Sequence, residues 1–337
     1  MVPVWQRASV NMMRIALELS LHDEGYEDVA IKFFEHFLLI AEAMDELGDD
    51  GLWDKDDEFF YDWLDLPNHD GHRLKLPLRV RSMVGLIPLY AAQVIDPRLL
   101  DRLPNFRKRL EWMLQERPEL AARVARWDVP SVGERRLLAI VSGDQLRAVL
   151  KRMLDESEFL SPYGVRALSR RHRDEPFRFP WNGQTYEVGC APAESPSDLF
   201  GGNSNWRGPI WMPVNFLLVE ALHKFHHYYG DEFKVECPAG SGRWLTLLEI
   251  ANELSGRLTK LFLRDADGRR PVFGDSTLEQ HDPLFRDLVL FYEYFDGDDG
   301  RGVGASHQTG WTGLVAKLIH PHREPHPDHI ASSGERD

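Results

Sequence analysis

The stretch from Gly201 to Asn215 reads G-G-N-S-N-W-R-G-P-I-W-M-P-V-N. It combines glycine, asparagine, arginine, tryptophan and proline, a mixture too rich in turn formers for an ordinary core element. The chain then continues from Met212 into a segment whose apolar residues recur at helical spacing, at Val214, Leu218, Ala221, Leu222 and Phe225. The pattern predicts a shaped polar loop attached to a rigid helix.

The aromatic and amide side chains of this loop allow two interpretations. Flat aromatic faces beside amides and a guanidinium suit a ligand that carries many hydroxyls, such as a sugar. The same residues could form a buried aromatic corner stabilised by an Asn-rich turn. The loop by itself favours neither interpretation.

The composition limits the kind of protein to which this loop can belong. With 337 residues, of which 43% are hydrophobic, the chain can bury one large core or two modest ones. A formal net charge of -14 disfavours a nucleic acid or an anionic membrane as partner. Cys190 and Cys237 are the only cysteines, and the sequence has no secretion signal and no long apolar run. These features predict a protein of the cytoplasm with no membrane association.

The spacing of apolar residues predicts a mainly helical chain. We expect helices over residues 6–21, 27–47, 79–95, 105–116, 120–126, 142–155, 212–229, 244–263, 282–292 and 311–319. Residues 52–66 are predicted to be a loop with short strands, and residues 159–199 a long irregular excursion of the kind that carries function. We therefore expect an all-α architecture over residues 1–320, followed by a disordered tail over 321–337.

Searches for motifs of metal, cofactor and nucleophile sites give no firm candidate. The sequence lacks a G-x-S-x-G elbow, a P-loop, a G-x-G-x-x-G after a strand and an H-E-x-x-H. His223 and His227 are four residues apart but have no third ligand in their motif. The acidic residues of 54–58 resemble the start of a calcium loop, but Phe59 stands where that loop needs glycine. We therefore predict no metal and no cofactor.

Glu293 is the carboxylate that the local sequence singles out. It lies in F-Y-E-Y-F-D-G-D-D-G, residues 291–300, between aromatic neighbours and just before a second Gly-rich loop over 297–310. We expect it at the end of a short helix, where it could act as a general base on water. The other interpretation is a Glu at a helix end that points into solvent.

Three segments together resemble glycoside hydrolase family 63. They are F-G-G-N-S-N-W-R-G-P-I-W-M-P-V-N at 200–215, F-Y-E-Y-F at 291–295 and G-A-S-H-Q-T-G-W-T-G-L-V-A-K-L-I at 304–319. They are similar to the C-terminal part of this family, which includes processing α-glucosidases and mannosylglycerate hydrolases, and most of all to its long bacterial members. The resemblance implies an (α/α)6 barrel with a sugar pocket at one end, an oligosaccharide or small glycoside as substrate, and hydrolysis with inversion.

The resemblance also assigns roles to individual residues. By motif position, Glu293 corresponds to the general base of the family. Residues that the resemblance places around the pocket are Trp206, Arg207, Trp311, Asn203 and His307.

The chain departs from the family at its N-terminus. The general acid of the family is an Asp that precedes the first helix seen here, whereas this chain opens with M-V-P-V-W and has no Asp before Asp23. We therefore expect a barrel that is incomplete at the N-terminus and lacks its proton donor. Asp54, Asp57 and Glu194 are equal candidates to replace it.

This departure leads to an alternative function and to a prediction about the surface. The chain could be an N-terminally truncated, catalytically inactive homologue that binds sugar or pairs with another piece. An incomplete barrel would expose helix faces, so we expect Val10, Met13 and Leu17 to form part of an apolar patch through which the chain associates with a partner.

Overall fold

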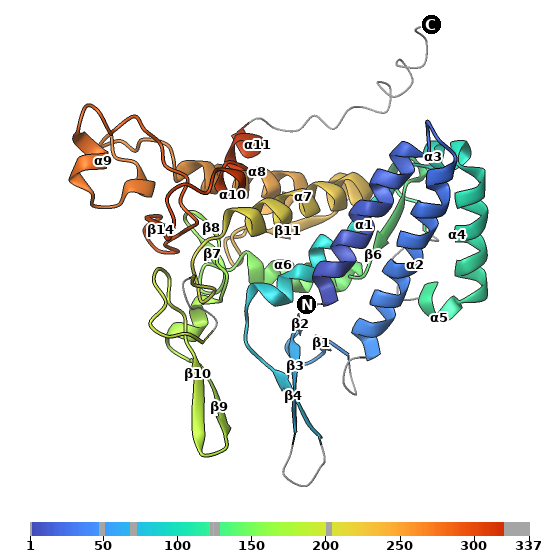
Figure 1. Cartoon of the computed structure of the whole chain (residues 1–337), viewed down its shortest axis with the longest axis horizontal. Coiled ribbons are helices and arrows are strands. Elements are labelled where there is room, and N and C mark those ends of the chain that lie inside the picture. The colour runs from blue at the N-terminus through green and yellow to red at the C-terminus, as the bar shows by residue number, and fades with distance from the viewer. Residues whose placement is uncertain are drawn as a thin grey trace, which may run out of the picture.

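The computed structural model describes residues 2–46, 51–67, 73–121, 124, 129–199 and 204–319 (Figure 1). Its α-helices are α1 (Val2–Leu19), α2 (Gly25–Glu46), α3 (Pro97–Arg102), α4 (Pro104–Glu116), α5 (Pro118–Ala121), α6 (Gly143–Met153), α7 (Met212–Tyr229), α8 (Leu247–Lys260), α9 (Thr277–His281), α10 (Thr309–Thr312) and α11 (Val315–Ile319). None of the helices within these ranges combines the length and apolar character needed to cross a membrane.

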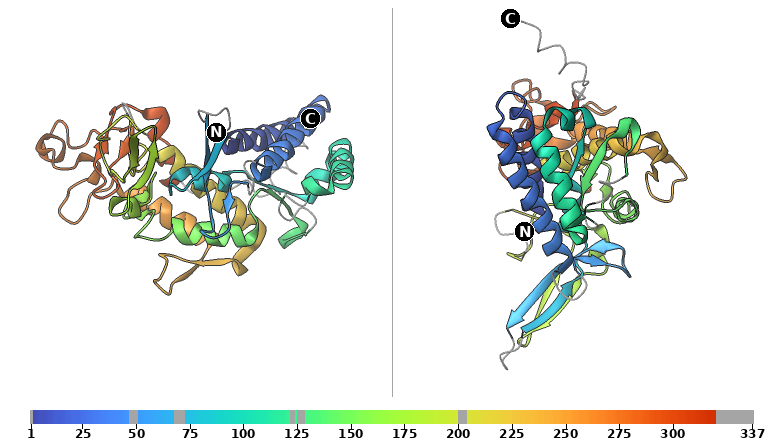
Figure 2. Two further views of the ribbon diagram at one scale, coloured as in Figure 1. Left: turned by 90° about the horizontal axis from the view of Figure 1, so that it is seen from below. Right: turned by 90° about the vertical axis from the view of Figure 1, so that its right-hand side faces the viewer.

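Short antiparallel strand pairs decorate the helices. The paired strands are β1 (Trp53–Asp54) with β2 (Phe59–Phe60), β3 (Asp62–Pro67) with β4 (Arg73–Leu78), β5 (Ala92–Ile95) with β6 (Arg136–Ala139), β7 (Leu160–Ser161) with β8 (Gly164–Val165), β9 (Phe177–Trp181) with β10 (Gln184–Val188), β11 (Lys234–Glu236) with β12 (Trp244–Thr246), and β13 (Tyr294–Phe295) with β14 (Gly302–Val303). The hairpins β3–β4 and β9–β10 project from the same side of the molecule (Figures 1 and 2).

Most of the predicted long helices are confirmed, and side-chain caps explain where two of them begin. Ser142 and Gln145 form a reciprocal capping box at the start of α6. Thr246 and Glu249 do the same for α8. The helix predicted over 244–263 therefore begins three residues later than expected, because residues 244–246 pair with β11.

The predicted helix over 79–95 is wrong. Residues Met83–Tyr90 form a 3-10 helix, η1, whose first turn is capped by Ser82, and the chain then extends into β5. Gly85 explains the tight packing of η1, because a Cβ atom at this position would lie 2.2 Å from the ring of Phe59 and 2.5 Å from the Phe60 carbonyl oxygen. Only glycine, which has no Cβ, allows the backbone of η1 to lie this close to β2.

The predicted helix over 282–292 is also wrong. The helical turn lies earlier, at α9, and the segment after it consists of turns and extended chain. The carboxylate of Asp282 accepts a hydrogen bond from the backbone N–H of Leu284 at 2.8 Å, which starts a turn in place of a helix. Leu284 and Leu288 of this segment do not face a core, since they are 78% and 57% exposed, whereas Phe291 and Tyr292 at its end pack against one.

The N-terminal helices α1 and α2 pack against each other, and α2 also packs against α4 (Figures 1 and 2). The predicted apolar patch of Val10, Met13 and Leu17 is wrong, because all three side chains are buried in this helical core. Among the side chains of α1 from residue 8 onward, the large apolar ones that are exposed are Met12, Ile15 and Leu19. The face that was expected to lack a partner is instead covered by α2, β5 and η1.

The largest core lies around α6, α7 and α8, which run through the middle of the molecule (Figure 1). Phe225 of α7 and Leu254 of α8 are buried there, together with Leu146 of α6. A hydrogen bond also links α7 to β5, because the Lys224 ammonium donates to the Ala92 carbonyl at 3.1 Å. This core fixes the position of α7, and therefore of the loop that precedes it.

Candidate active site

Glu293 lies immediately before β13 and not at the end of a helix, so the expected local structure is corrected. Its Oε1 atom accepts a hydrogen bond from the Ser204 hydroxyl at 2.8 Å, and its Oε2 atom accepts one from the backbone N–H of Ala305 at 3.4 Å. Gly304, at φ +74°, allows this close approach, since a Cβ there would lie 2.8 Å from Oε2. The carboxylate is half-buried and held on both oxygens.

Backbone hydrogen bonds join the loop before α7 to the strand that follows Glu293. The N–H of Ile210 donates to the Phe295 carbonyl at 2.8 Å, and the N–H of Phe295 donates back at 3.0 Å. The described part of this loop, residues 204–211, and the Glu293 motif are therefore adjacent in space, although more than 80 residues separate Ile210 from Glu293 in the sequence.

Trp211 is the centre of an aromatic cluster beside Glu293. Its buried ring stacks parallel to Trp206, with centroids 3.9 Å apart, and stacks on Tyr294 at 4.8 Å. Trp311 approaches the same ring edge-on at 6.0 Å. The structure thus brings the predicted Trp206 and Trp311 together on Trp211, next to the residue that follows Glu293.

Asn205 clamps the irregular segment 191–195 against this cluster. Its buried amide donates to the carbonyls of Ala191 and Ala193, and its side-chain oxygen accepts from the N–H of Arg207 at 2.9 Å. The Trp211 indole donates to the Asn205 carbonyl at 2.9 Å. One buried amide therefore fixes both the loop and the excursion that packs on it.

Arg207 faces the same segment. Its Nη2 atom donates to the Ser195 hydroxyl at 3.0 Å. Within the part of the chain that the structure describes, Arg207 forms no hydrogen bond or ion pair with Glu293. Its Nε atom is buried and has no hydrogen-bond partner within the described ranges. Burial lowers the pKa of the Arg207 guanidinium, which is a sign of a desolvated charge.

Two carboxylates act electrostatically on the hydroxyl of Tyr294. Burial is the main cause that raises the pKa of Tyr294 to about 12, and the negative charges of Glu194 and Glu293 raise it further. Glu194 lies between Ala193, held by Asn205, and Ser195, held by Arg207. The hydrogen bonds from Asn205 and Arg207 therefore hold the segment that carries Glu194, the second carboxylate that acts on Tyr294.

The other two candidate acids are engaged elsewhere. Asp54 pairs with Arg79 at 2.7 Å. Burial raises the pKa of Asp57, but hydrogen bonds from Arg81 and Tyr61 and the positive charges of Arg81 and Arg152 more than offset this, so the pKa of Asp57 lies below its usual value. A carboxyl that loses its proton so readily is unsuited to donate one at neutral pH.

His307 and Asn203 are the two remaining residues that the resemblance places around the pocket. His307 is exposed at the edge of the site, where its Nδ1 atom lies 2.8 Å from the Ser306 hydroxyl. Asn203 lies outside the described residues. The sequence-based prediction missed Ser204, Asn205 and Tyr294, although all three lie inside or beside the quoted motifs.

Among the residues that the structure describes, no group of three or more His, Cys, Asp or Glu side chains is placed to hold a metal ion. In the calcium-like stretch, the carboxylate of Asp54 is occupied by Arg79 and by the backbone N–H groups of Asp56 and Asp57.

Residues 137–312 match the family model of the mannosylglycerate hydrolase MGH1-like glycoside hydrolase domain. The match covers more than half of the chain and includes Glu293, Trp206, Trp211 and Trp311. The chain therefore belongs to this family of glycoside hydrolase domains.

Yeast proteins are among its curated relatives. The uncharacterized protein YMR196W of Saccharomyces cerevisiae is 49% identical over 327 residues, which cover 92% of this chain and 30% of that protein. The mannosyl-oligosaccharide glucosidase of S. cerevisiae is 25% identical over 52% of this chain and 15% of its own length. A probable mannosyl-oligosaccharide glucosidase of Schizosaccharomyces pombe is 26% identical over 54% and 16%. The chain thus spans less than a third of each relative.

A solved structure of a sialidase aligns with 94% of this chain and 19% of its own, at 14% identity. Its TM-score of 0.44 is too low to assign a fold.

Proposed function

We propose that this chain carries the general-base side of an inverting α-glycosidase site, and that the bond it hydrolyses is an α-glucosidic or related α-glycosidic bond. The observation that carries the proposal is the placement of Glu293, whose two oxygens accept hydrogen bonds at the edge of the Trp206–Trp211–Trp311 cluster. In an inverting hydrolase, a fixed carboxylate activates water on one face of the sugar while an acid protonates the leaving oxygen on the other.

The remaining residues of the site fit the binding of a polyhydroxylated ligand. Trp311 is 38% exposed, so part of its ring is open to a sugar face. The unpartnered Nε atom of Arg207 is a donor that a ligand or an ordered water could satisfy. An oligosaccharide substrate is consistent with the printed names of the yeast glucosidases, which we extend to this chain as part of the proposal.

We also propose that the helices form part of an (α/α)6 barrel in a cytoplasmic protein. The packing of α1 on α2 and of α7 on α8 as neighbouring pairs supports the barrel. The free thiols of Cys190 and Cys237 fit a reducing compartment. For association with a partner, the described part of α1 offers the exposed apolar side chains of Met12, Ile15 and Leu19.

The stereochemistry of the product tests the mechanism. We expect proton NMR of a fresh reaction with an α-linked glucosyl disaccharide to show the β-anomer of glucose first, because water attacks the face opposite the leaving group. The measurement applies to this chain and to the longest natural polypeptide that contains it. First appearance of the α-anomer would contradict inversion, whereas slow hydrolysis with β-anomer product would not.

The alternative function, a homologue without its general acid, rests on the ion pairing of Asp54 and Asp57. A chain without a proton donor should hydrolyse a dinitrophenyl α-glucoside, whose leaving group needs little protonation, on the order of 10² times faster than a disaccharide. The measurement is kcat/KM for both substrates. Comparable values would contradict the loss of the acid.

If the values of kcat/KM for the two substrates are comparable, Glu194→Gln tests whether Glu194 is the proton donor. Replacement of the acid should slow hydrolysis of the disaccharide and leave the dinitrophenyl substrate little changed. An equal loss on both substrates would assign Glu194 to binding and not to protonation.

A further inference from the structure

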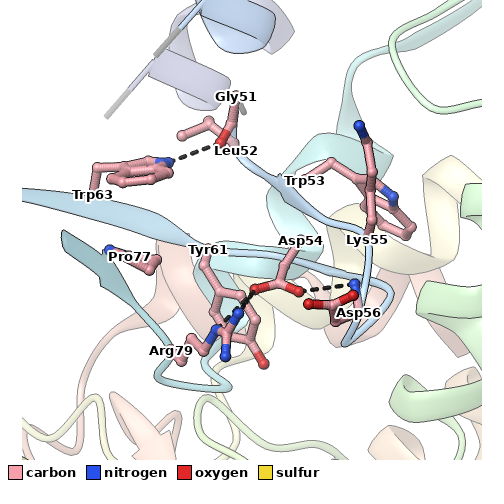
Figure 3. Close-up of a pocket in the computed structure, with 10 residues that line it drawn as sticks. All are labelled: Gly51, Leu52, Trp53, Asp54, Lys55, Asp56, Tyr61, Trp63, Pro77 and Arg79. Atoms are coloured by element: carbon pink, nitrogen blue, oxygen red, sulfur yellow. Dashed lines mark hydrogen bonds and ion pairs between the residues drawn. The ribbon is translucent and has the colours of Figure 1, made fainter. Parts of the chain in front are cut away.

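A cavity of about 300 Å³ lies between the β1–β2 hairpin and the β3–β4 hairpin (Figure 3). Its lining includes the indoles of Trp53 and Trp63, with Tyr61 and Arg79 between them. The volume is at the lower end of the range of about 300 to 1,000 Å³ that is typical of small-molecule sites. None of the residues that line it belongs to the Glu293 site.

The two aromatic walls are held in place before any ligand binds. The Trp63 indole donates to the Gly51 carbonyl at 2.8 Å, as the dashed line in Figure 3 shows. Trp53 packs edge-on against Phe60 with ring centroids 4.7 Å apart. Rings that are already fixed lose little rotamer freedom on binding, so their faces are available to an apolar ligand surface at small entropic cost.

The charged groups of the cavity cancel one another. Asp54 pairs with Arg79 at 2.7 Å, and Figure 3 shows this pair beside Tyr61. Lys55 and Asp56 are exposed at the rim. Two acidic and two basic side chains leave no net charge for an ionic ligand, but they offer both donors and acceptors to hydroxyl groups.

From this combination we propose that the cavity binds a neutral hexose unit of an oligosaccharide, as a site separate from that of Glu293. Indole faces suit the apolar face of a pyranose ring, while the carboxylate and guanidinium suit its hydroxyls. The proposal does not depend on hydrolysis at Glu293 and would stand if that activity were absent.

The chain connects the two sites over a short distance. Arg79 lines the cavity, and four residues later Met83 packs on the cluster that contains Trp211 and Tyr294. Between them, Arg81 is anchored by ion pairs to Asp57 and Glu158. A sugar bound in the cavity therefore sits on a rigid segment that leads to the candidate active site.

Tryptophan indole signals in a ¹H–¹⁵N spectrum test the proposal directly. Trp53→Phe and Trp63→Phe assign the two cavity signals, and Trp206→Phe and Trp311→Phe assign those of the other site. The probes are two neutral trisaccharides, maltotriose and mannotriose, with glucose 6-phosphate as a charged comparison. We expect at least one neutral probe to shift the Trp53 and Trp63 signals, in the wild-type chain and in Glu293→Gln alike.

Arg79→Gln removes the guanidinium from a side chain that is 55% exposed, and the Asp54 carboxylate, which is 11% exposed, keeps its hydrogen bonds from the N–H groups of Asp56 and Asp57. We expect it to weaken the response of the cavity signals by at least about tenfold, the loss of one good polar contact. Arg178→Gln is the matched control, because Arg178 is an exposed arginine in a single ion pair on β9. Shifts confined to Trp206 and Trp311, a response to glucose 6-phosphate alone, or unchanged binding by Arg79→Gln would each overturn the proposal.

Discussion

Replacement of Glu293 by Gln is expected to lower kcat by about 10³- to 10⁴-fold and to change KM little. A general base contributes about 10² to 10⁴ to the rate, and an amide of the same shape cannot take a proton from water. The side-chain oxygen of Gln can accept from the N–H of Ala305 while its NH2 group donates to the Ser204 hydroxyl oxygen. The loop should therefore keep its position. The measurement is steady-state kinetics on an α-glucosyl disaccharide, in the longest natural polypeptide that contains this sequence.

Two controls separate chemistry from folding. Ser204→Ala removes one hydrogen bond to the carboxylate and should reduce kcat by only about 10- to 100-fold, in line with the ~1.5–3 kcal/mol of a hydrogen bond to a charged group. Glu279→Gln changes a glutamate that accepts from the Tyr292 hydroxyl and should leave kcat unchanged. A Glu293→Gln protein that retains a tenth or more of wild-type kcat would remove Glu293 from the role of base.

Arg81→Met is expected to reduce the free energy of unfolding by about 3 to 5 kcal/mol, the typical effect of breaking a buried ion pair on one side. The guanidinium is almost fully buried, and it pairs with Asp57 and, at 2.7 Å, with Glu158. Arg152 also contacts both carboxylates but is more exposed. Urea unfolding followed by circular dichroism measures the change, and Arg178→Met, in an exposed pair, should show almost none.

The pH dependence of stability provides a second readout of the same network. The pKa of Asp57 is lower in the folded chain than in the unfolded chain, so its stabilising effect is complete above the unfolded value of about 4 and is lost as the pH falls through the folded value. Wild-type protein should therefore lose more stability than Arg81→Met on acidification below about pH 4. Equal acid sensitivity of the two proteins would show that Arg81 does not hold the pKa of Asp57 down.

The sequence predicted the helices with strong periodicity, because the apolar spacing of α2, α7 and α8 reports a local requirement for one buried face. It failed at η1 and at residues 282–292. In both places the decisive interactions are specific contacts, the approach of Gly85 to Phe59 and the turn at Asp282. Periodicity alone also could not orient α1, since apolar residues occur on both of its faces.

Motif order named Trp206, Trp311 and Glu293 as members of the candidate site, but it did not indicate the contacts of the other polar members. The rings of Trp206 and Trp311 both contact the ring of Trp211. Arg207 instead faces Ser195, which lies in an excursion whose path no local pattern indicates. The clamp of Asn205 on Ala191 and Ala193 is likewise a contact between segments that only the three-dimensional structure reveals.

The backbone pairing of Ile210 with Phe295 has a consequence for biosynthesis. A ribosome adds roughly 5 to 20 residues per second, so the loop leaves it several seconds before the strand that completes the site. During that interval Trp206 and Trp211 have no Tyr294 to cover them, whereas α1 and α2 can already pack on each other. The N-terminal helices are therefore the first part of the nascent chain able to bury a core, and the aromatic cluster beside Glu293 is among the last features to form.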